Sequence, residues 1–68
     1  MIFLRETLDD LLKKAEYCKK QVVACEEQAS FWAKRGRFSL ADAWKRNAAS
    51  YREALALTEK RIESANKD

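Results

Sequence analysis

Apolar and small side chains recur along most of this chain at alternating intervals of three and four residues. The first series comprises Leu4, Leu8, Leu11, Ala15, Cys18, Val22, Cys25, Ala29 and Trp32; the second comprises Ala41, Trp44, Ala48, Tyr51, Leu55, Thr58, Ile62 and Ala65. This spacing places each series along one side of an α-helix, as in a coiled coil. The sequence therefore predicts two long helices, over about residues 5–35 and 40–66, each with an apolar seam.

The two series are separated by a short stretch with turn and capping signals. Gly36 suits the left-handed conformation just past a helix end, and Ser39 suits the residue that caps the next helix, with Asp42 three residues later. We therefore expect a turn over residues 36–39. A turn this short makes consecutive helices antiparallel neighbours, so the fold class is an all-α antiparallel hairpin forming one domain over residues 1–68.

One register brings the two seams together. When residues whose numbers add to 73 are paired, every seam residue from position 8 onward meets another seam residue. Trp32 then faces Ala41 and Trp44 faces Ala29, so each large ring lies against a small side chain, as well-packed layers require. Agreement over eight layers favours the hairpin.

The N-terminal residues leave two alternatives open. Thr7 and Asp10 form a capping-box pattern, which predicts that the first helix begins at Leu8 and that residues 1–6 form an arm. The helix can instead continue back to Phe3. In both cases Ile2, Phe3 and Leu4 find no partner inside the hairpin, so we expect them to contribute to an oligomer interface.

A second stripe of small or weakly polar residues runs beside the seam of the second helix. It contains Leu40, Ala43, Asn47, Ser50, Ala54 and Leu57, and the first helix carries a more polar counterpart of Tyr17, Gln21, Ala24, Gln28 and Phe31. An alanine-rich face exposed to solvent is one interpretation. A chain of 68 residues, however, buries only about 60% of its unfolded surface and needs further support. We therefore expect a homodimer, in which two hairpins close into a four-helix bundle.

Composition excludes most chemistry. The chain has no histidine and no glycine-rich phosphate loop, so we expect no enzymatic activity, metal or cofactor. Cys18 and Cys25 lie two helical turns apart, about 10 Å, which is too far for a disulfide. Two reduced thiols in a seam suit a cytoplasmic protein. No segment is long enough to span a membrane, and we expect no membrane partner.

The region between the seams concentrates positive charge and aromatic rings. Residues 34–46 carry five cations and one acid, a net charge of +4, while the whole chain carries +3. Arginine and lysine beside aromatic rings are typical of contacts with phosphates and with proteins. The same cations also complement the end of the first helix, which is a purely structural interpretation. The candidate binding residues are Phe31, Lys34, Arg35, Arg37, Phe38, Lys45 and Arg46.

These features favour a small non-enzymatic interaction or regulatory protein that presents a helical surface to a protein partner. Its size is typical of regulators encoded by phages or mobile elements. One alternative is an anion binder, with RNA, DNA or a nucleotide-like ligand at the basic region. A third is a structural oligomerisation unit that uses the N-terminal arm. In length, heptads and single short turn the plan resembles the small homodimeric helical hairpins that bind RNA in plasmid regulation; no functional residue is carried over from it.

Overall fold

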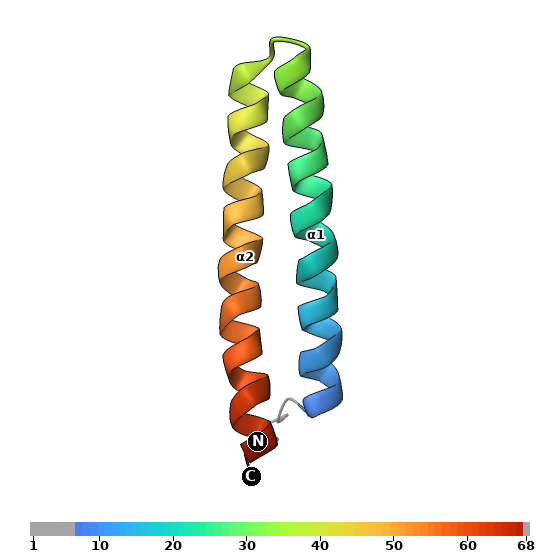
Figure 1. The fold of residues 1–68 in the computed structure, drawn as a ribbon, viewed down its shortest axis with the longest axis vertical. Helices are drawn as coiled ribbons and strands as arrows, with labels where there is room; N and C mark the ends of the chain where they lie inside the picture. Colours follow the sequence, from blue (N-terminus) through green and yellow to red (C-terminus); the bar gives the residue numbers. More distant parts are fainter. Residues whose placement is uncertain (1–6, 68) are drawn as a thin grey trace, which may run out of the picture.

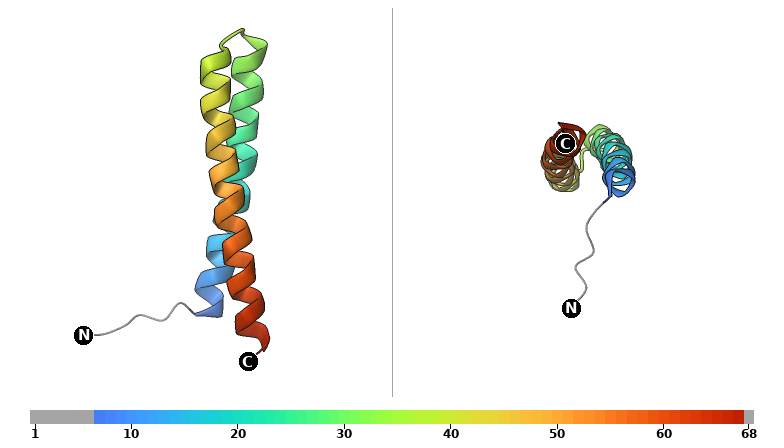
Figure 2. Two further views of the ribbon diagram at one scale, coloured as in Figure 1. Left: turned by 90° about the vertical axis from the view of Figure 1, so that its left-hand side faces the viewer. Right: turned by 90° about the horizontal axis from the view of Figure 1, so that it is seen from below.

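The chain folds as an antiparallel pair of long helices. The computed structural model describes residues 7–67, in which α1 spans Leu8–Lys34 and α2 spans Phe38–Lys67. The helices lie side by side over their whole length, joined by one tight turn (Figure 1). Seen from the side they cross at a shallow angle (Figure 2), as helices do when heptad seams pack together. The predicted all-α hairpin is confirmed.

The predicted seams form the core. On α1 the buried residues are Leu11, Ala15, Cys18, Val22, Cys25 and Ala29; on α2 they are Ala41, Ala48 and Thr58. The larger side chains of the α2 seam, among them Trp44, Tyr51 and Leu55, are only half-buried. Two helices alone therefore bury small side chains well and leave large ones partly open to solvent.

Thr58 is the one polar residue in the described core, and it is satisfied within its own helix. Its hydroxyl donates a hydrogen bond to the backbone carbonyl of Ala54 at 2.8 Å. A buried hydroxyl without a partner costs about 1–3 kcal/mol, so this bond lets threonine occupy a seam position. The buried seam therefore continues through position 58 although Thr58 is a polar residue.

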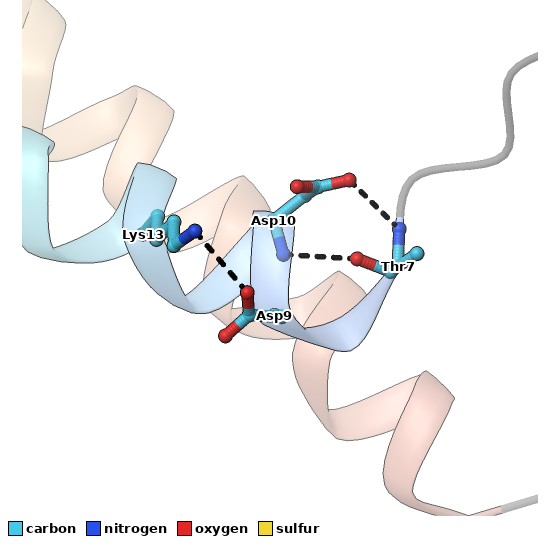
Figure 3. Close-up of polar contacts among 4 residues, drawn as sticks. All are labelled: Thr7, Asp9, Asp10 and Lys13. Carbon is cyan, nitrogen blue, oxygen red and sulfur yellow. Dashed lines mark hydrogen bonds and ion pairs between the residues drawn. The ribbon is translucent and has the colours of Figure 1, made fainter.

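The N-terminus of α1 is fixed by a reciprocal cap. The Asp10 backbone N–H donates to the Thr7 hydroxyl at 3.1 Å, and the Thr7 N–H donates to the Asp10 carboxylate at 3.3 Å (Figure 3). Asp9 adds an ion pair with Lys13 at 3.3 Å. Of the two alternatives, the start at Leu8 is confirmed, and the estimate of a start near residue 5 is wrong. The arm over residues 1–6, with Ile2, Phe3 and Leu4, lies outside the described residues.

The turn is shorter than predicted. The Gly36 N–H donates to the Ala33 carbonyl and the Arg37 N–H to the Trp32 carbonyl, at 3.0 and 2.9 Å, which closes α1 as a Schellman motif. Gly36 has φ of 76°, the left-handed conformation predicted for it. The Ala41 N–H then donates to the Arg37 carbonyl, so helical bonding resumes at once.

This early restart corrects two predictions. The second helix begins at Phe38 and not near residue 40, and Ser39 lies inside its first turn instead of capping it. The physical reason is that the Schellman closure already directs the chain after Gly36 along the second helix. Ser39 therefore has no role in ending the turn, and the turn predicted over residues 36–39 is over before Phe38.

Two contacts across the helix pair flank the seam on opposite sides. Glu26 forms an ion pair with Arg52, and the rings of Tyr17 and Tyr51 meet edge to face with centroids 6.3 Å apart. In the predicted register, the numbers of residues that face each other add to 73. The numbers of Glu26 and Arg52 add to five more than this, and those of Tyr17 and Tyr51 to five fewer. The pairing that the seams predict lies midway between these contacts, as expected for an antiparallel register.

We predict that Thr7→Ala lowers the free energy of unfolding by about 1 kcal/mol, because the Asp10 N–H loses its acceptor at the helix end. Thr7→Ser keeps the hydroxyl and serves as the matched control. Urea denaturation followed by circular dichroism, at one fixed protein concentration, measures the difference. Equal stability of the two variants would show that the cap contributes nothing.

We predict that Gly36→Ala costs about 1–2 kcal/mol through its backbone conformation alone. A Cβ at this position meets no atom within 4 Å, so no steric clash adds to that cost. Gly36→Asn should cost less, because asparagine adopts positive φ more readily than alanine. Thermal unfolding of the three proteins tests the order glycine, asparagine, alanine; any other order contradicts it.

Candidate interaction site at the hairpin tip

The predicted basic residues are all exposed at one end of the molecule, which we call the hairpin tip, residues 31–46. Lys34 and Arg35 end α1, Arg37 lies between the helices, and Lys45 and Arg46 follow in α2. None of the five forms an ion pair with a described residue. The tip therefore keeps a net charge of +4 that the fold does not neutralise.

Ion pairs at i,i+4 spacing form at some of the positions where an acid precedes a cation by four residues. Asp9 pairs with Lys13, and Glu16 lies 3.7 Å from Lys20, as i,i+4 spacing predicts. Asp42 and Arg46 have the same spacing but form no ion pair. Arg46 is consequently available to a partner, although its nearest acid lies only one turn away.

The two tryptophans of the tip belong to the seam. Trp32 and Trp44 are half-buried, and the register sets each opposite an alanine that is among the most buried residues, Ala41 and Ala29. Their rings consequently contribute to packing, as the sequence predicts. The aromatic side chains left for a binding surface are Phe31 and Phe38.

Phe31 is held in a layered contact with its own helix. Its ring meets that of Trp32 edge to face at 5.0 Å, and the Arg35 guanidinium lies over it, 4.3 Å from the centroid. A cation above an aromatic face gains about 0.5–1 kcal/mol at an exposed site. The ring remains 44% exposed and, with Lys34 and Glu27, lines a shallow hollow on the surface.

Phe38 occupies a different part of the tip. It is 67% exposed, the most exposed large apolar side chain among the described residues. With Arg37 and Leu40 it lines a second hollow beside the turn, which shares no residue with the hollow around Phe31. The structure thus separates the two phenylalanines into two patches, and they do not form one aromatic surface.

The side of the hairpin on which each phenylalanine lies follows from its spacing to the nearest seam residue. Glu26 and Arg52, which directly follow seam residues, meet across one side of the hairpin. Residues that directly precede seam residues must then meet on the opposite side, because the two helices are antiparallel. Phe38 comes three residues before Ala41 and shares the Glu26–Arg52 side, while Phe31 shares the other.

The side opposite the Glu26–Arg52 pair carries no charge over its central length. It joins the second stripes of both helices into one surface, the charge-free face, composed of Tyr17, Gln21, Ala24, Gln28 and Phe31 on α1 and Leu40, Ala43, Asn47, Ser50, Ala54 and Leu57 on α2. Its four large apolar side chains, Tyr17, Phe31, Leu40 and Leu57, are 40–56% exposed. Half of the exposed large apolar residues of the described chain therefore lie on this face.

The Glu26–Arg52 side has the opposite character. Toward the open ends of the helices it forms a groove, whose lining includes Leu12 and Ile62 together with Glu16, Lys19, Glu59 and Glu63. Charged side chains at this density favour contact with water. The hairpin consequently has one charged side, on which Leu12 and Phe38 are also exposed, and one side whose central part is uncharged.

Sequence reasoning found the two stripes separately and missed that they share one side. The signal was present, since Gln21, Gln28, Leu40, Asn47 and Ala54 each directly precede a seam residue. It also missed the contact between Tyr17 and Tyr51. This neighbour raises the pKa of the Tyr51 phenol, because the negative charge of an ionised Tyr17 and its hydrogen bond with Tyr51 both disfavour the ionised form of Tyr51.

The remaining chemistry of the described residues is structural. Cys18 and Cys25 are free thiols buried in the seam. No group of three or more histidine, cysteine or carboxylate side chains within residues 7–67 is placed to hold a metal ion. Neither α1 nor α2 is apolar enough along its length to cross a membrane.

No protein-family model, curated protein or solved structure matches this chain. Its function has to be inferred from the hairpin tip and the charge-free face themselves.

We predict that reversing three tip cations together, in Arg35→Glu, Arg37→Glu and Arg46→Glu, leaves the fold intact and changes its stability by less than about 1 kcal/mol. None of the three has an ion pair to lose. The contact that is lost is that of the Arg35 guanidinium with the Phe31 ring, about 0.5–1 kcal/mol at an exposed site. A glutamate at position 35 opposes the dipole of α1, while one at 37 favours that of α2, so the two effects offset. Circular dichroism and thermal unfolding test this; loss of helix would assign the cations a structural role.

Proposed function

We propose that this chain is a small non-enzymatic interaction protein that works as a homodimeric four-helix bundle and binds a protein partner through the hairpin tip. The observation that carries the proposal is Phe38, a large aromatic side chain two-thirds exposed beside cations that the fold leaves without ion pairs. Leaving such a side chain in water contributes nothing to folding. Its exposure is explained if a partner covers it.

The chemistry around Phe38 suits a protein surface. Aromatic and arginine side chains contribute most of the binding free energy at protein interfaces, typically from a small central cluster. Phe38 and Arg37 are adjacent to the rigid end of a helix, so ordering them on binding costs little. Lys45, two turns along α2 on the same side, extends this patch and favours an acidic partner.

The dimer is supported by what the hairpin leaves uncovered. Its core consists mainly of small side chains, and Trp44, Tyr51 and Leu55 remain half-exposed. The charge-free face offers a second surface whose own side chains are uncharged, with the Arg35 guanidinium over Phe31 at its edge. Burying it therefore desolvates little charge. Packing two such faces together gives the four-helix bundle that the size of the chain favours.

A second candidate function is anion binding at the same tip. It is favoured by the net charge of +4 over residues 31–46 and by the absence of acidic residues in the first turn of α2, whose N–H groups face the turn. RNA, DNA or a nucleotide-like ligand would be held mainly through phosphates. The two candidates share residues but differ in the forces that they use.

We predict that Phe38→Ala with Arg37→Ala abolishes capture of the protein partner from a lysate of the native host. The matched control is Val23→Ala with Lys13→Ala, which removes an exposed apolar group and a cation away from the tip. The control should capture the partner as the parent chain does. If the tip variant retains the partner at parental levels, the site is wrong.

Salt separates the two candidate functions. Capture of a protein through Phe38 should change little between 0.05 and 0.5 M salt, whereas log affinity for duplex DNA should fall with log salt at a slope of about −0.9 per phosphate contact. Nuclease treatment before elution distinguishes a bound nucleic acid from a bound protein. Binding that survives the triple reversal of Arg35, Arg37 and Arg46 unchanged would contradict the anion-binding candidate.

A further inference from the structure

We infer that two copies of the chain stack antiparallel across the charge-free face, so that their hairpin tips lie at opposite ends of the bundle. This inference rests on the dimer of the proposed function and specifies its symmetry. A two-fold axis that crosses both helices at right angles sets α1 on the partner's α1 and α2 on the partner's α2. A two-fold axis along the helices would instead set α1 on the partner's α2 and bring both tips together.

The residues of α1 on this face are arranged symmetrically about Ala24. Tyr17 and Phe31 lie seven positions to either side of it, and Gln21 and Gln28 lie three and four positions away. With the axis at Ala24, each Tyr17 meets the partner's Phe31 and each glutamine meets the other glutamine. Two alanines then face each other on the axis, where the backbones approach most closely.

The residues of α2 show the same symmetry about a point between Ala48 and Ala49. Like side chains are related across that point, large apolar to large apolar, small to small and polar to polar. The three pairs are Leu40 with Leu57, Ala43 with Ala54, and Asn47 with Ser50. An interface between two copies related by a two-fold axis requires such pairs, because residue i of one copy contacts residue j of the other and residue j contacts residue i in return.

The two centres lie at the same height in the hairpin. The register that joins the helices sets the level of Ala24 beside Ala49, next to the centre found independently on α2. A single two-fold axis can therefore pass through both centres at once. Nothing in the packing of α1 against α2 requires this coincidence, because the charge-free face lies outside the seam.

The distribution of charge favours the same arrangement. The hairpin tip has a net charge of +4, whereas residues 13–17 and 51–59, which the two centres set beside the tip of the other copy, hold three acids and three cations. The antiparallel dimer sets each tip beside this neutral region. The alternative brings two tips of +4 together, which is unfavourable at separations comparable to the Debye length of about 8 Å at physiological salt.

The arrangement has a functional consequence. The turn lies about twelve residues from Ala24, or ~18 Å along the helix, so the two turns are ~36 Å apart. The Phe38 patches then lie near opposite ends of the dimer, each on the side of its hairpin that faces away from the interface. Such a dimer binds two copies of its partner, or two sites on one partner, without steric conflict between them.

Chemical cross-linking between two single-cysteine variants tests the symmetry. Leu40→Cys and Leu57→Cys are prepared separately, mixed and treated with a short bismaleimide, and the same is done with Tyr17→Cys and Phe31→Cys. We expect a cross-linked dimer in each mixture and little in any variant alone. The parent chain is the control for Cys18 and Cys25, which are buried and should not react.

Each other outcome overturns a defined part of the account. A dimer by sedimentation in which Leu40→Cys cross-links to Phe31→Cys and not to Leu57→Cys would overturn the antiparallel symmetry and leave the dimer standing. Positions 40 and 57 are ~25 Å apart along α2, so the two arrangements cannot give the same product. A monomer for the parent chain at every concentration would instead overturn the dimer of the proposed function.

Discussion

The close approach of α1 and α2 along a seam of small side chains is the constraint on which the rest of the structure depends. Ala15, Cys25 and Ala29 on α1, and Ala41 and Ala48 on α2, are among the most buried residues. Small residues let the helix backbones come together, but they bury little apolar area per layer. The same feature that defines the register therefore leaves the hairpin with a thin core and a need for further cover.

The two sides of the hairpin differ in how well they can be covered by another molecule. The side of Glu26 and Arg52 is charged and exposes Phe38 at the tip, whereas the opposite side presents Tyr17, Phe31, Leu40 and Leu57 among small uncharged residues. Because the two seams face each other, they fix how each helix is rotated about its own axis and decide which residues share a side. The separation of Phe31 from Phe38 follows from this rotation. It gives the tip a proposed dimer surface and a proposed partner surface, with Leu40 at the border of the two.

Heptad spacing was enough to predict the seams, because a seam residue is defined by period alone. The capping box at Thr7 and the left-handed Gly36 were equally readable, since each depends on a few adjacent residues. Ser39 was wrongly predicted to cap α2. The early start of α2 follows from the backbone hydrogen bonds of the Schellman motif, and the side chain of Ser39 carries no signal of these bonds. The tip was predicted as one patch because its cations and aromatic residues are close together in the sequence. Phe31 and Phe38 nevertheless lie on opposite sides of the hairpin, because they occupy different positions around their helices.

Sedimentation equilibrium of the parent chain beside an Ala43→Glu variant tests the central claim most directly, that the charge-free face is buried between two copies. Ala43 is exposed and outside the seam, so a glutamate there does not disturb the hairpin, but it places a charge in the proposed interface. The account predicts twice the chain mass of 7.9 kDa for the parent and a shift toward 7.9 kDa for the variant. A parent of 7.9 kDa at every concentration, or a variant that dimerises as tightly as the parent, would contradict it.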